Sequence, residues 1–229
     1  MEACPGALRR SPLFRGMEEA QIRRVVDCLG GRLRTLPGGG PVLRAGDPAT
    51  HLGVVTAGGV EISRLKADGQ RVVMGEAGPG GLFAESFACA RAESLPVTVT
   101  ARPGTAVLLL DCRRICAPCA AACGCHTQLI SNLLSALAEK NLRLAGKVDH
   151  LSGRTIRARL LSYLEELSAR TGRDTVTVPF DRQALADYLC VDRSALSRTI
   201  GALRREGALE VRRNRFTLRA ISTTEEAKP

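Results

Sequence analysis

The sequence predicts an α+β protein in which an antiparallel β unit comes first, one long helix follows, and a small helical domain with two strands ends the chain. Three observations predict this order. Turn-forming Gly and Pro residues recur over 33–111, apolar residues keep a heptad spacing over 130–151, and two short helices precede two strand-like runs after Asp181. The 229 residues are enough for one large domain or two ordinary ones.

The charge balance points to a polyanionic partner. The formal net charge is +10, a sign and size that favour nucleic acid or an acidic membrane face. No apolar run is long enough to cross a bilayer, and the start MEACPGALRRSPLF lacks the basic and apolar parts of a secretory signal. We therefore expect a cytoplasmic protein without a membrane partner, in a compartment where its nine cysteines stay reduced.

The N-terminal elements are a helix and a β unit. The stretch 13–29, LFRGMEEAQIRRVVDCL, predicts a short helix that ends at a pair of glycines. Over 33–111, strand-like pieces such as VEISRL and QRVVMGE alternate with Gly- and Pro-rich turns. This alternation predicts a compact antiparallel structure, with Cys28 and Cys89 as small apolar side chains of its core.

The long helix carries an apolar seam. Its residues are spaced 4-3-4-3-4-3, which is the heptad pattern of a coiled coil with one polar member. They are Ile130, Leu134, Leu137, Asn141, Leu144, Val148 and Leu151. A single Asn in such a seam costs stability but fixes the register of a parallel two-stranded pair. The seam predicts a dimerisation helix over 127–151, although an amphipathic helix packed on its own domain has the same pattern.

The C-terminal part alternates helices with short strands. A helix is predicted over 155–169, and the strand TVTVPF follows it. Two short helices come next, over 182–189 and 193–206, and the strand-like runs ALEVRR and RFTLRA come after them. The polar tail STTEEAKP, residues 222–229, is expected to fray.

The two short helices and the final strands match a winged helix-turn-helix. Asp181 and Asp192 stand where each helix needs an N-cap. The stretch 193–219 holds eight Arg and only two acidic residues. Because a guanidinium is a planar fork that fits phosphate oxygens and guanine edges, this domain is predicted to bind DNA. The candidate contacts are Arg182, Gln183, Arg193, Ser194, Ser197, Arg198, Arg204 and Arg213, and the predicted inward residues are Leu196, Ile200 and Leu203.

This order of elements resembles the CRP/FNR family of bacterial transcription regulators. The stretch DRQALADYLCVDRSALSRTIGALRREG is similar to the family's DNA-reading motif, and the resemblance covers residues 13–218. It implies an N-terminal β-roll (a double-stranded β-helix like that of cyclic-nucleotide-binding domains) and a homodimer on a palindromic operator of double-stranded DNA. It also implies RNA polymerase as a partner and no enzymatic activity. The expected parts are a sensor domain over 1–126, the dimerisation helix over 127–151, a DNA-binding domain over 152–221 and the tail.

Two positions of the motif depart from the family. FNR-like members have Glu where this chain has Ser194, whereas Ser197 and Arg198 match. The resemblance therefore transfers an Arg–guanine contact to Arg198 but no Glu–cytosine contact, and the half-site sequence stays open. Cys190 stands where many relatives have Gly in the tight turn, so its backbone is strained if φ is positive.

The family's cyclic-nucleotide cassette is degenerate in this chain. In nucleotide-binding members a Glu holds the ribose and an Arg-Ser pair holds the cyclic phosphate. In GGLFAESFACARAESLPVTVTA, Glu85 takes the Glu position, while Leu95 and Pro96 take those of the pair. Neither side chain can neutralise or hydrogen-bond a phosphate, so cyclic AMP is not expected to bind.

A second candidate site is the cysteine-rich segment CRRICAPCAAACGCH, residues 112–126. Pro118 and Gly124 predict a loop that can wrap around an ion, between the β unit and the long helix. Thiolates at these spacings suit an iron–sulfur cluster or a tetrahedral Zn²⁺ site. FNR holds its cluster mainly through an N-terminal cysteine group, of which this chain has only Cys4, so those ligands do not transfer. The candidate ligands, of which a subset would bind, are Cys112, Cys116, Cys119, Cys123, Cys125 and His126.

The sequence leaves the signal open. We expect a regulator that responds to redox state, oxygen or nitric oxide through an iron–sulfur cluster, and a zinc site, a thiol–disulfide switch, haem, a small-molecule effector or metal-free cysteines remain alternatives. The signal would shift a two-state equilibrium between DNA-competent and incompetent dimers. A thiol–disulfide oxidoreductase is disfavoured because CAPC does not open a helix beside a parallel sheet. A cyclic-nucleotide-binding module without DNA function is disfavoured by the arginine-rich wing.

Overall fold

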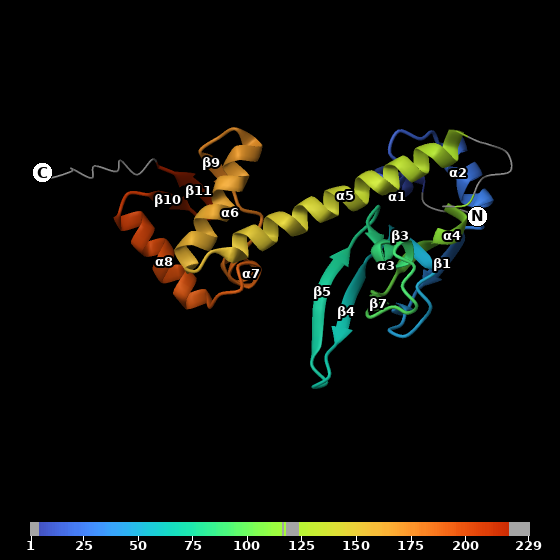
Figure 1. Cartoon of the computed structure of the whole chain (residues 1–229), viewed down its shortest axis with the longest axis horizontal. Coiled ribbons are helices and arrows are strands. Elements are labelled where there is room, and N and C mark those ends of the chain that lie inside the picture. Colours follow the sequence, from blue (N-terminus) through green and yellow to red (C-terminus); the bar gives the residue numbers. More distant parts are fainter. Residues whose placement is uncertain (1–4, 116, 118–123, 220–229) are drawn as a thin grey trace, which may run out of the picture. The chain divides into compact units, whose positions relative to one another are not determined.

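The chain divides into two compact units. The computed structural model describes residues 5–115, 117 and 124–219, and the units are residues 1–139 and 140–229. The division lies inside the long helix α5 (Gly124–Ser152), so each unit contains one end of that helix (Figure 1). None of the helices within the described residues is long and apolar enough to cross a membrane. Four of the cysteines and the predicted tail lie outside the described residues: Cys4, Cys116, Cys119, Cys123 and 222–229.

Two four-stranded antiparallel sheets form the first unit, which confirms the predicted antiparallel β unit. The strand order is β1-β8-β3-β6 in one sheet and β2-β7-β4-β5 in the other. The strands are β1 (Arg32–Leu36), β2 (Gly40–Leu43), β3 (His51–Ala57), β4 (Val60–Leu65), β5 (Arg71–Ala77), β6 (Leu82–Phe83), β7 (Thr98–Ala101) and β8 (Thr105–Asp111). The helices are α1 (Pro5–Arg10), the 3₁₀ turn η1 (Pro12–Phe14), α2 (Glu19–Cys28), α3 (Glu85–Cys89) and α4 (Cys112–Ile115).

The sheet that contains β3 and β8 is buried on both faces. Because successive side chains of a strand point to opposite faces, β8 contributes Leu108 and Leu110 to a core shared with the helices, and Val107 to a core made by both sheets. Gly53 on β3 lies against the ring of Phe83, where an added Cβ would come within 1.9 Å of a ring carbon. Only glycine fits this contact, because the neighbour is a fully buried ring that has no room to move.

The predicted helix over 13–29 begins only at Glu19, which corrects its N-terminal boundary. The chain turns at Gly16, whose φ is +74°, and a capping box between Glu18 and Gln21 starts α2. The Gln21 side-chain oxygen accepts a hydrogen bond from the Glu18 N–H at 2.7 Å. Cys28, the last residue of α2, is exposed, so its predicted place in the core is wrong.

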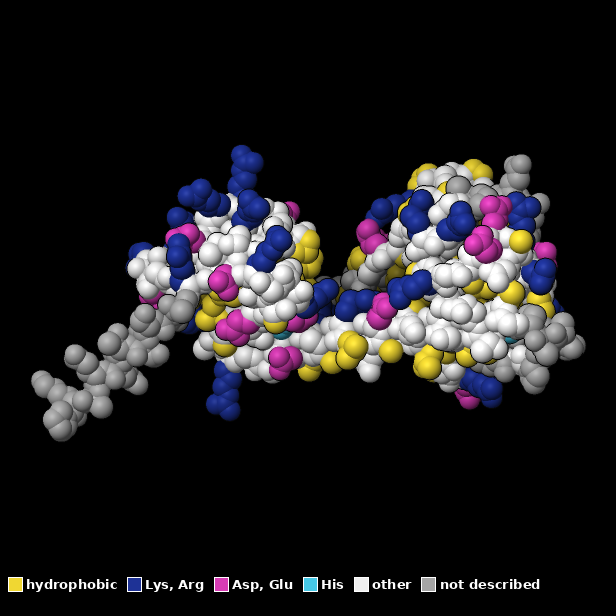
Figure 2. All heavy atoms as spheres, turned by 90° about the horizontal axis from the view of Figure 1, so that it is seen from above, with side chains coloured by type: hydrophobic (Ala, Val, Ile, Leu, Met, Phe, Trp, Pro, Cys, Tyr) yellow, Lys and Arg dark blue, Asp and Glu magenta, His cyan; other side chains and the backbone are white. Residues whose placement is uncertain are grey.

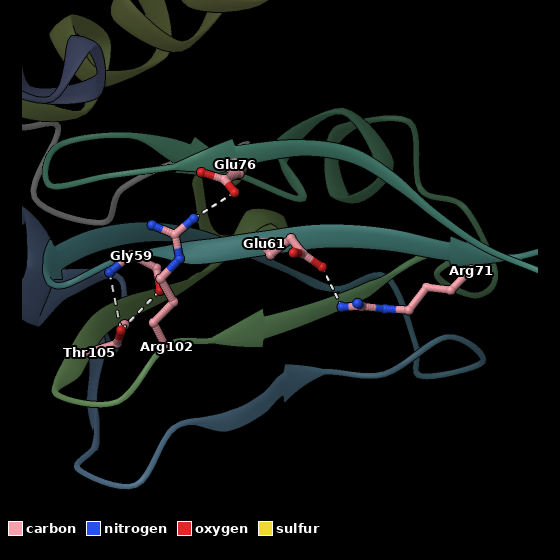
Figure 3. A network of polar contacts seen from close by, with 6 residues as sticks. All are labelled: Gly59, Glu61, Arg71, Glu76, Arg102 and Thr105. Atoms are coloured by element: carbon pink, nitrogen blue, oxygen red, sulfur yellow. Dashed lines mark hydrogen bonds and ion pairs between the residues drawn. The ribbon is translucent and has the colours of Figure 1, made fainter. Parts of the chain in front are cut away.

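Turns and exposed ion pairs order the β hairpins of the first unit (Figure 3). The buried Thr105 hydroxyl accepts a hydrogen bond from the Gly59 N–H at 3.1 Å and donates one to the Gly59 carbonyl at 2.9 Å. Arg71 on β5 pairs with Glu61 on the neighbouring strand β4, and Arg102, just after β7, pairs with Glu76 on β5. The Thr105 contact satisfies buried backbone groups. It contributes more to folding stability than the ion pairs do, because ion pairs exposed to water add at most about 1 kcal/mol each.

In the degenerate cassette, the position of the family's Arg is filled by an apolar core residue. Glu85 is the first residue of α3 and is buried. Leu95 is 2% exposed and belongs to the core made by the two sheets, while the adjacent Pro96 is exposed. Backbone hydrogen bonds fix the Leu95 position: its N–H donates to the Asp47 carbonyl at 2.8 Å, and its carbonyl accepts from the Gly46 N–H at 2.9 Å. The position that holds Arg in nucleotide-binding members is therefore part of the core.

We expect Leu95→Arg to destabilise the first unit by about 3–5 kcal/mol, because it forces an unpaired charge into an apolar core. Pro96→Ser, one residue further on and exposed, is the matched control and should cost less than about 1 kcal/mol. Urea unfolding of the two variants checks this. Similar losses for both would mean that the Leu95 side chain is not packed as described.

The second unit is a three-stranded sheet with helices. Its sheet has the order β10-β11-β9, and the predicted helices are all present with boundaries that differ by one or two residues. Thr155 caps α6 by accepting a hydrogen bond from the Ala158 N–H, and Gly172, with φ of +63°, ends it. The elements are α6 (Ile156–Thr171), β9 (Thr175–Thr177), α7 (Arg182–Tyr188), α8 (Arg193–Arg205), β10 (Leu209–Arg212) and β11 (Arg215–Leu218).

A buried histidine ties the end of α5 to the helices of the second unit. His150 is 3% exposed, and its Nε2 lies 2.6 Å from a carboxylate oxygen of Glu166 on α6. Its Nδ1 lies 3.2 Å from the hydroxyl of Tyr188 on α7, and its ring packs edge-on against Tyr163. Burial raises the pKa of Tyr163 to about 12, so its hydroxyl stays protonated at neutral pH. The last turn of α5 is therefore fixed to the helices that precede and begin the helix-turn-helix.

Candidate nucleic-acid interface and cysteine sites

Two capped helices and a tight turn form the candidate DNA-binding surface. The carboxylate of Asp181 accepts a hydrogen bond from the Ala184 N–H at 2.8 Å, and that of Asp192 accepts one from the Ala195 N–H at 2.9 Å. Both predicted N-caps are therefore present. The apolar residues of α8 predicted to face inward are buried in the core of this unit: Leu196, Ile200 and Leu203. The other face of α8 is left to solvent.

Seven of the eight predicted DNA-contact residues are exposed. Figure 2 shows Lys and Arg side chains gathered on the surface of the second unit. Arg193 starts α8, and Ser197 and Arg198 lie one turn further on, so the three share one exposed face near its N-terminus. The exposed residues are Gln183, Arg193, Ser194, Ser197, Arg198, Arg204 and Arg213.

Two predicted contacts are engaged in local hydrogen bonds. The Ser194 hydroxyl donates to the Asp192 carboxylate, which is the main reason why the pKa of that carboxyl lies below its usual value. The Gln183 side-chain amide donates to Asp187 at 2.9 Å. Ser194 therefore supports the N-cap of α8. This structural role differs from the base contact that the family resemblance gives to Glu at this position.

Arg182 lies at the start of α7 beside the wing. Its guanidinium carbon lies 5.5 Å from the centre of the Phe216 ring, and burial lowers the pKa of the guanidinium, which nevertheless stays charged. An open pocket of about 270 Å³ lies between this helix end and the wing turn. Its lining residues are Phe180, Asp181, Arg182, Leu185, Arg213, Asn214 and Phe216. Arg182 is thus partly buried, unlike the other seven candidates.

The turn before α8 has the strained backbone that the sequence suggests. Cys190 has φ of +52° and is exposed. We expect Cys190→Gly to stabilise the second unit by about 0.5–1 kcal/mol, because glycine adopts this conformation without the Cβ clash but loses more entropy on folding. Cys190→Ala keeps a Cβ and is the matched control that should give no gain. Thermal unfolding checks both, and an equal gain from Ala would assign the effect to the thiol instead.

The predicted dimer seam is mostly exposed. Among its members Ile130, Leu134, Leu144 and Val148 are large apolar side chains in contact with solvent. Leu137 and Leu151 are half-buried, and Leu137 packs against the core of the first unit together with the buried Leu129, Leu133 and Ala136. Figure 2 shows such hydrophobic side chains at the surface of the long helix. One face of α5 thus packs on the first unit, while the exposed members of the seam have no covering element among the described residues.

The described members of the cysteine-rich segment lie in helices. Cys112 begins α4, and Cys125 and His126 lie in the first turn of α5, so the predicted loop does not include them. Cys125 is buried in the core of the first unit. His126 is also buried, and its Nε2 lies 3.2 Å from the Arg114 carbonyl. In the described part of the chain no three His, Cys, Asp or Glu side chains are grouped as a metal site would need.

One cysteine contact was missed by sequence reasoning. The Cys89 sulfur lies 3.3 Å from the Cys112 sulfur, which joins the end of α3 to the start of α4. Cys89 is half-buried and Cys112 is buried. The Cys112 side chain is the main reason why the pKa of the Cys89 thiol lies below its usual value, against an opposite effect of burial and of Glu85. Because 23 positions separate the two cysteines, no local spacing could have predicted the pair.

Two family models match this chain. A Crp-like helix-turn-helix domain matches residues 158–223, and a cyclic nucleotide-binding domain matches residues 33–114. The first covers the capped helices and the wing, and the second covers most of the two sheets.

Named relatives match over most of the chain. The probable transcriptional regulator flp of Lacticaseibacillus casei is 28% identical over 201 residues, which are 87% of each chain. The nitrogen fixation regulation protein FixK of Bradyrhizobium diazoefficiens is 28% identical over 214 residues, which are 90% of this chain and 84% of that protein. The catabolite activator protein of Thermus thermophilus is similar in structure, with a TM-score of 0.53 at 23% identity over 92% of this chain and 95% of its own.

Proposed function

Because this chain belongs to the CRP/FNR family of bacterial transcription regulators, we propose that it is a homodimer that recognises a palindromic operator and responds to a signal at its cysteines. The observation that carries the DNA-binding part is the exposed face of α8, where Arg193, Ser197 and Arg198 stand on a capped helix beside an arginine-rich wing. In helix-turn-helix proteins this part of the second helix contacts base edges.

The contacts divide into two kinds. We assign base readout to Arg198, since a guanidinium can bond to guanine O6 and N7 together, and to the neighbouring Ser197. Arg182, Arg204 and Arg213 would contact phosphates, which position the domain without reading sequence. Ser194 is assigned to capping because its hydroxyl is bonded to Asp192. This division predicts that the half-site differs from that of FNR-like members at the base pair that their Glu reads.

The dimer part of the proposal is supported by the exposed seam of α5. Four large apolar side chains in water are unfavourable, and burying a Leu or Val contributes about 1.5–3 kcal/mol. Asn141 is also exposed and stands at a position where a partner Asn would fix a parallel register. A second copy of the chain, aligned along the same seam, would bury the apolar side chains and provide a partner for Asn141. It also presents two recognition helices to successive major grooves.

A binding selection from a random DNA library tests this function. Purified protein should enrich a palindrome whose half-sites are one helical turn apart, and footprinting should show protection in two successive major grooves. Failure to enrich any sequence over the input library, under both oxic and anoxic handling, would remove the proposal. Recruitment of RNA polymerase at the enriched site, measured by transcription in vitro, distinguishes activation from repression.

We assign signal sensing to a cysteine-ligated centre in the segment 112–126, an iron–sulfur cluster first and Zn²⁺ second. The donor set supports this, because thiolates are the preferred ligands of both. Cys112 is engaged with Cys89, so the ligands would come from Cys125 and from Cys116, Cys119 and Cys123 outside the described residues. Iron, sulfide and zinc analysis of protein purified without oxygen tests the centre. Metal-free protein whose DNA affinity still responds to oxygen or nitric oxide would contradict it.

A further inference from the structure

The contact between Cys89 and Cys112 is a second cysteine site, separate from the ligands assigned above. The two sulfurs are 3.3 Å apart and come from different helices, α3 and α4. Cys112 follows β8 directly, and its N–H donates to the Thr50 carbonyl at 2.9 Å, so its backbone is fixed. Cys89 ends α3, whose Ala88 is packed in the core of the first unit. Both thiols are thus held close together by the rigid part of the unit.

We propose that Cys89 and Cys112 form a reversible disulfide when the protein meets a hydroperoxide, independently of any metal in the cysteine-rich segment. The difference in exposure sets the order of the steps. Cys89 is half-buried and can be reached from solvent, whereas Cys112 is buried. Cys89 is therefore the attacking thiol and Cys112 the resolving thiol.

The chemistry balances with peroxide as the only oxidant. The Cys89 thiolate attacks one peroxide oxygen, the O–O bond breaks, and hydroxide leaves as water, which gives a sulfenic acid on Cys89. The Cys112 sulfur then attacks the Cys89 sulfur, the S–O bond breaks, and the oxygen leaves as a second water with the Cys112 proton. Two thiols lose two electrons and two protons, and one hydrogen peroxide becomes two waters. A dithiol reductant reverses the product by thiol–disulfide exchange.

The lowered pKa of the Cys89 thiol favours the first step. The Cys112 thiol can donate its hydrogen to a thiolate at Cys89, which is the main reason why that pKa is lowered, and this raises the thiolate fraction near neutral pH. Glu85, one turn earlier on α3, acts in the opposite direction because its carboxylate repels a thiolate. The proposal stands on the sulfur–sulfur contact and on the unequal exposure, and the charge effects only adjust its rate.

The arrangement of tryptic sites makes the product easy to identify. Cleavage after Arg71, Arg91 and Arg113 gives one peptide, 72–91, whose only cysteine is Cys89, and one peptide, 92–113, whose only cysteine is Cys112. The cysteine-rich peptide, 115–140, is separate from both.

The experiment uses full-length protein that has been stripped of metal with a chelator, reduced and desalted. It is treated with one equivalent of hydrogen peroxide, alkylated, and digested without reductant.

We expect a linked species of peptides 72–91 and 92–113 as the main oxidation product, and its loss after dithiol treatment. In Cys112→Ser the link should vanish while Cys89 is trapped as a sulfenic acid by dimedone. Cys28→Ser, which removes an exposed cysteine of α2, is the matched control and should keep the link. Linkage of 72–91 to 115–140 instead, or free Cys89 and Cys112 in protein whose Cys28 and Cys190 are oxidised, would overturn the proposal.

A second readout does not depend on Cys112→Ser folding well. The disulfide closes a loop across α3 and α4, so oxidised wild-type protein should melt several degrees higher than reduced protein. Cys89→Ser, at a half-buried position, should show no such shift with peroxide. An equal upward shift in Cys89→Ser would place the disulfide elsewhere and contradict the assignment. Neither measurement uses DNA, so a failure of the disulfide proposal would leave the proposed regulatory function untouched.

Discussion

Arg198→Ala should strongly weaken operator recognition with little effect on the fold. The side chain is exposed on the N-terminal half of α8, whose apolar face is buried on the opposite side. A bidentate Arg–guanine contact contributes about 1–3 kcal/mol, and a dimer makes it twice, so the loss is about 2–6 kcal/mol, or roughly 30-fold to 10⁴-fold in Kd. Titration of the selected operator at fixed salt measures this change.

The matched control separates base readout from simple loss of charge. Arg173→Ala removes the same charge from an exposed position of the same unit, after α6 and before β9. It should leave operator affinity within a few fold and lower non-specific binding only slightly. We expect Arg198→Ala to reduce the ratio of operator to random-DNA affinity, whereas Arg173→Ala should preserve that ratio. Equal losses from both variants would mean that Arg198 contacts only phosphates.

Leu144→Asp should convert the protein to a monomer. Leu144 is a seam residue that is 63% exposed, so within one chain a carboxylate there costs little. In a dimer it would place two like charges in an apolar interface and remove two buried leucines. The dimer should therefore lose at least about 3 kcal/mol, or roughly 100-fold in its dissociation constant. Sedimentation equilibrium measures this, and operator binding should weaken in parallel.

Leu142 offers a close control for the seam. It lies on the same helix, two residues away, and is 72% exposed, but it does not belong to the heptad positions. Leu142→Asp should stay dimeric with unchanged operator affinity. If both variants dissociate, the interface does not follow the predicted heptads, and if neither does, α5 is not the dimer contact.

The sequence predicts the elements well where the signal is local. The caps Asp181 and Asp192, the inward face of α8 and the antiparallel alternation of 33–111 all follow from short-range spacing, and the structure confirms them. The strain at Cys190 was raised by the family resemblance, since many relatives have Gly at that turn position, and the positive φ shows that the condition for it is met. The start of α2 was missed because tertiary burial of Leu13 and Phe14 gives a helical-looking apolar pattern to residues that form a 3₁₀ turn.

Long-range contacts account for what the sequence could not show. Cys89 and Cys112 meet only because the sheets bring α3 beside the end of β8, and no spacing rule joins residues that far apart. Ser194 looked like a substitute for a base-reading Glu, but a neighbouring carboxylate two residues earlier takes its hydroxyl. The Ser194 contact spans only two positions and could have been read from the predicted N-cap, whereas the cysteine pair depends on three-dimensional packing.

The anchoring of His150 has a consequence for the operators that this protein accepts. Glu166 and Tyr188 hold the end of α5, so Val148 and Leu151 of the seam belong to the same rigid unit as α8. If two protomers pair through these seam residues, the separation of their α8 helices can change little. One extra base pair between the half-sites rotates one half-site by about 34° about the DNA axis relative to the other. We therefore expect spacer length to be discriminated as strictly as base identity.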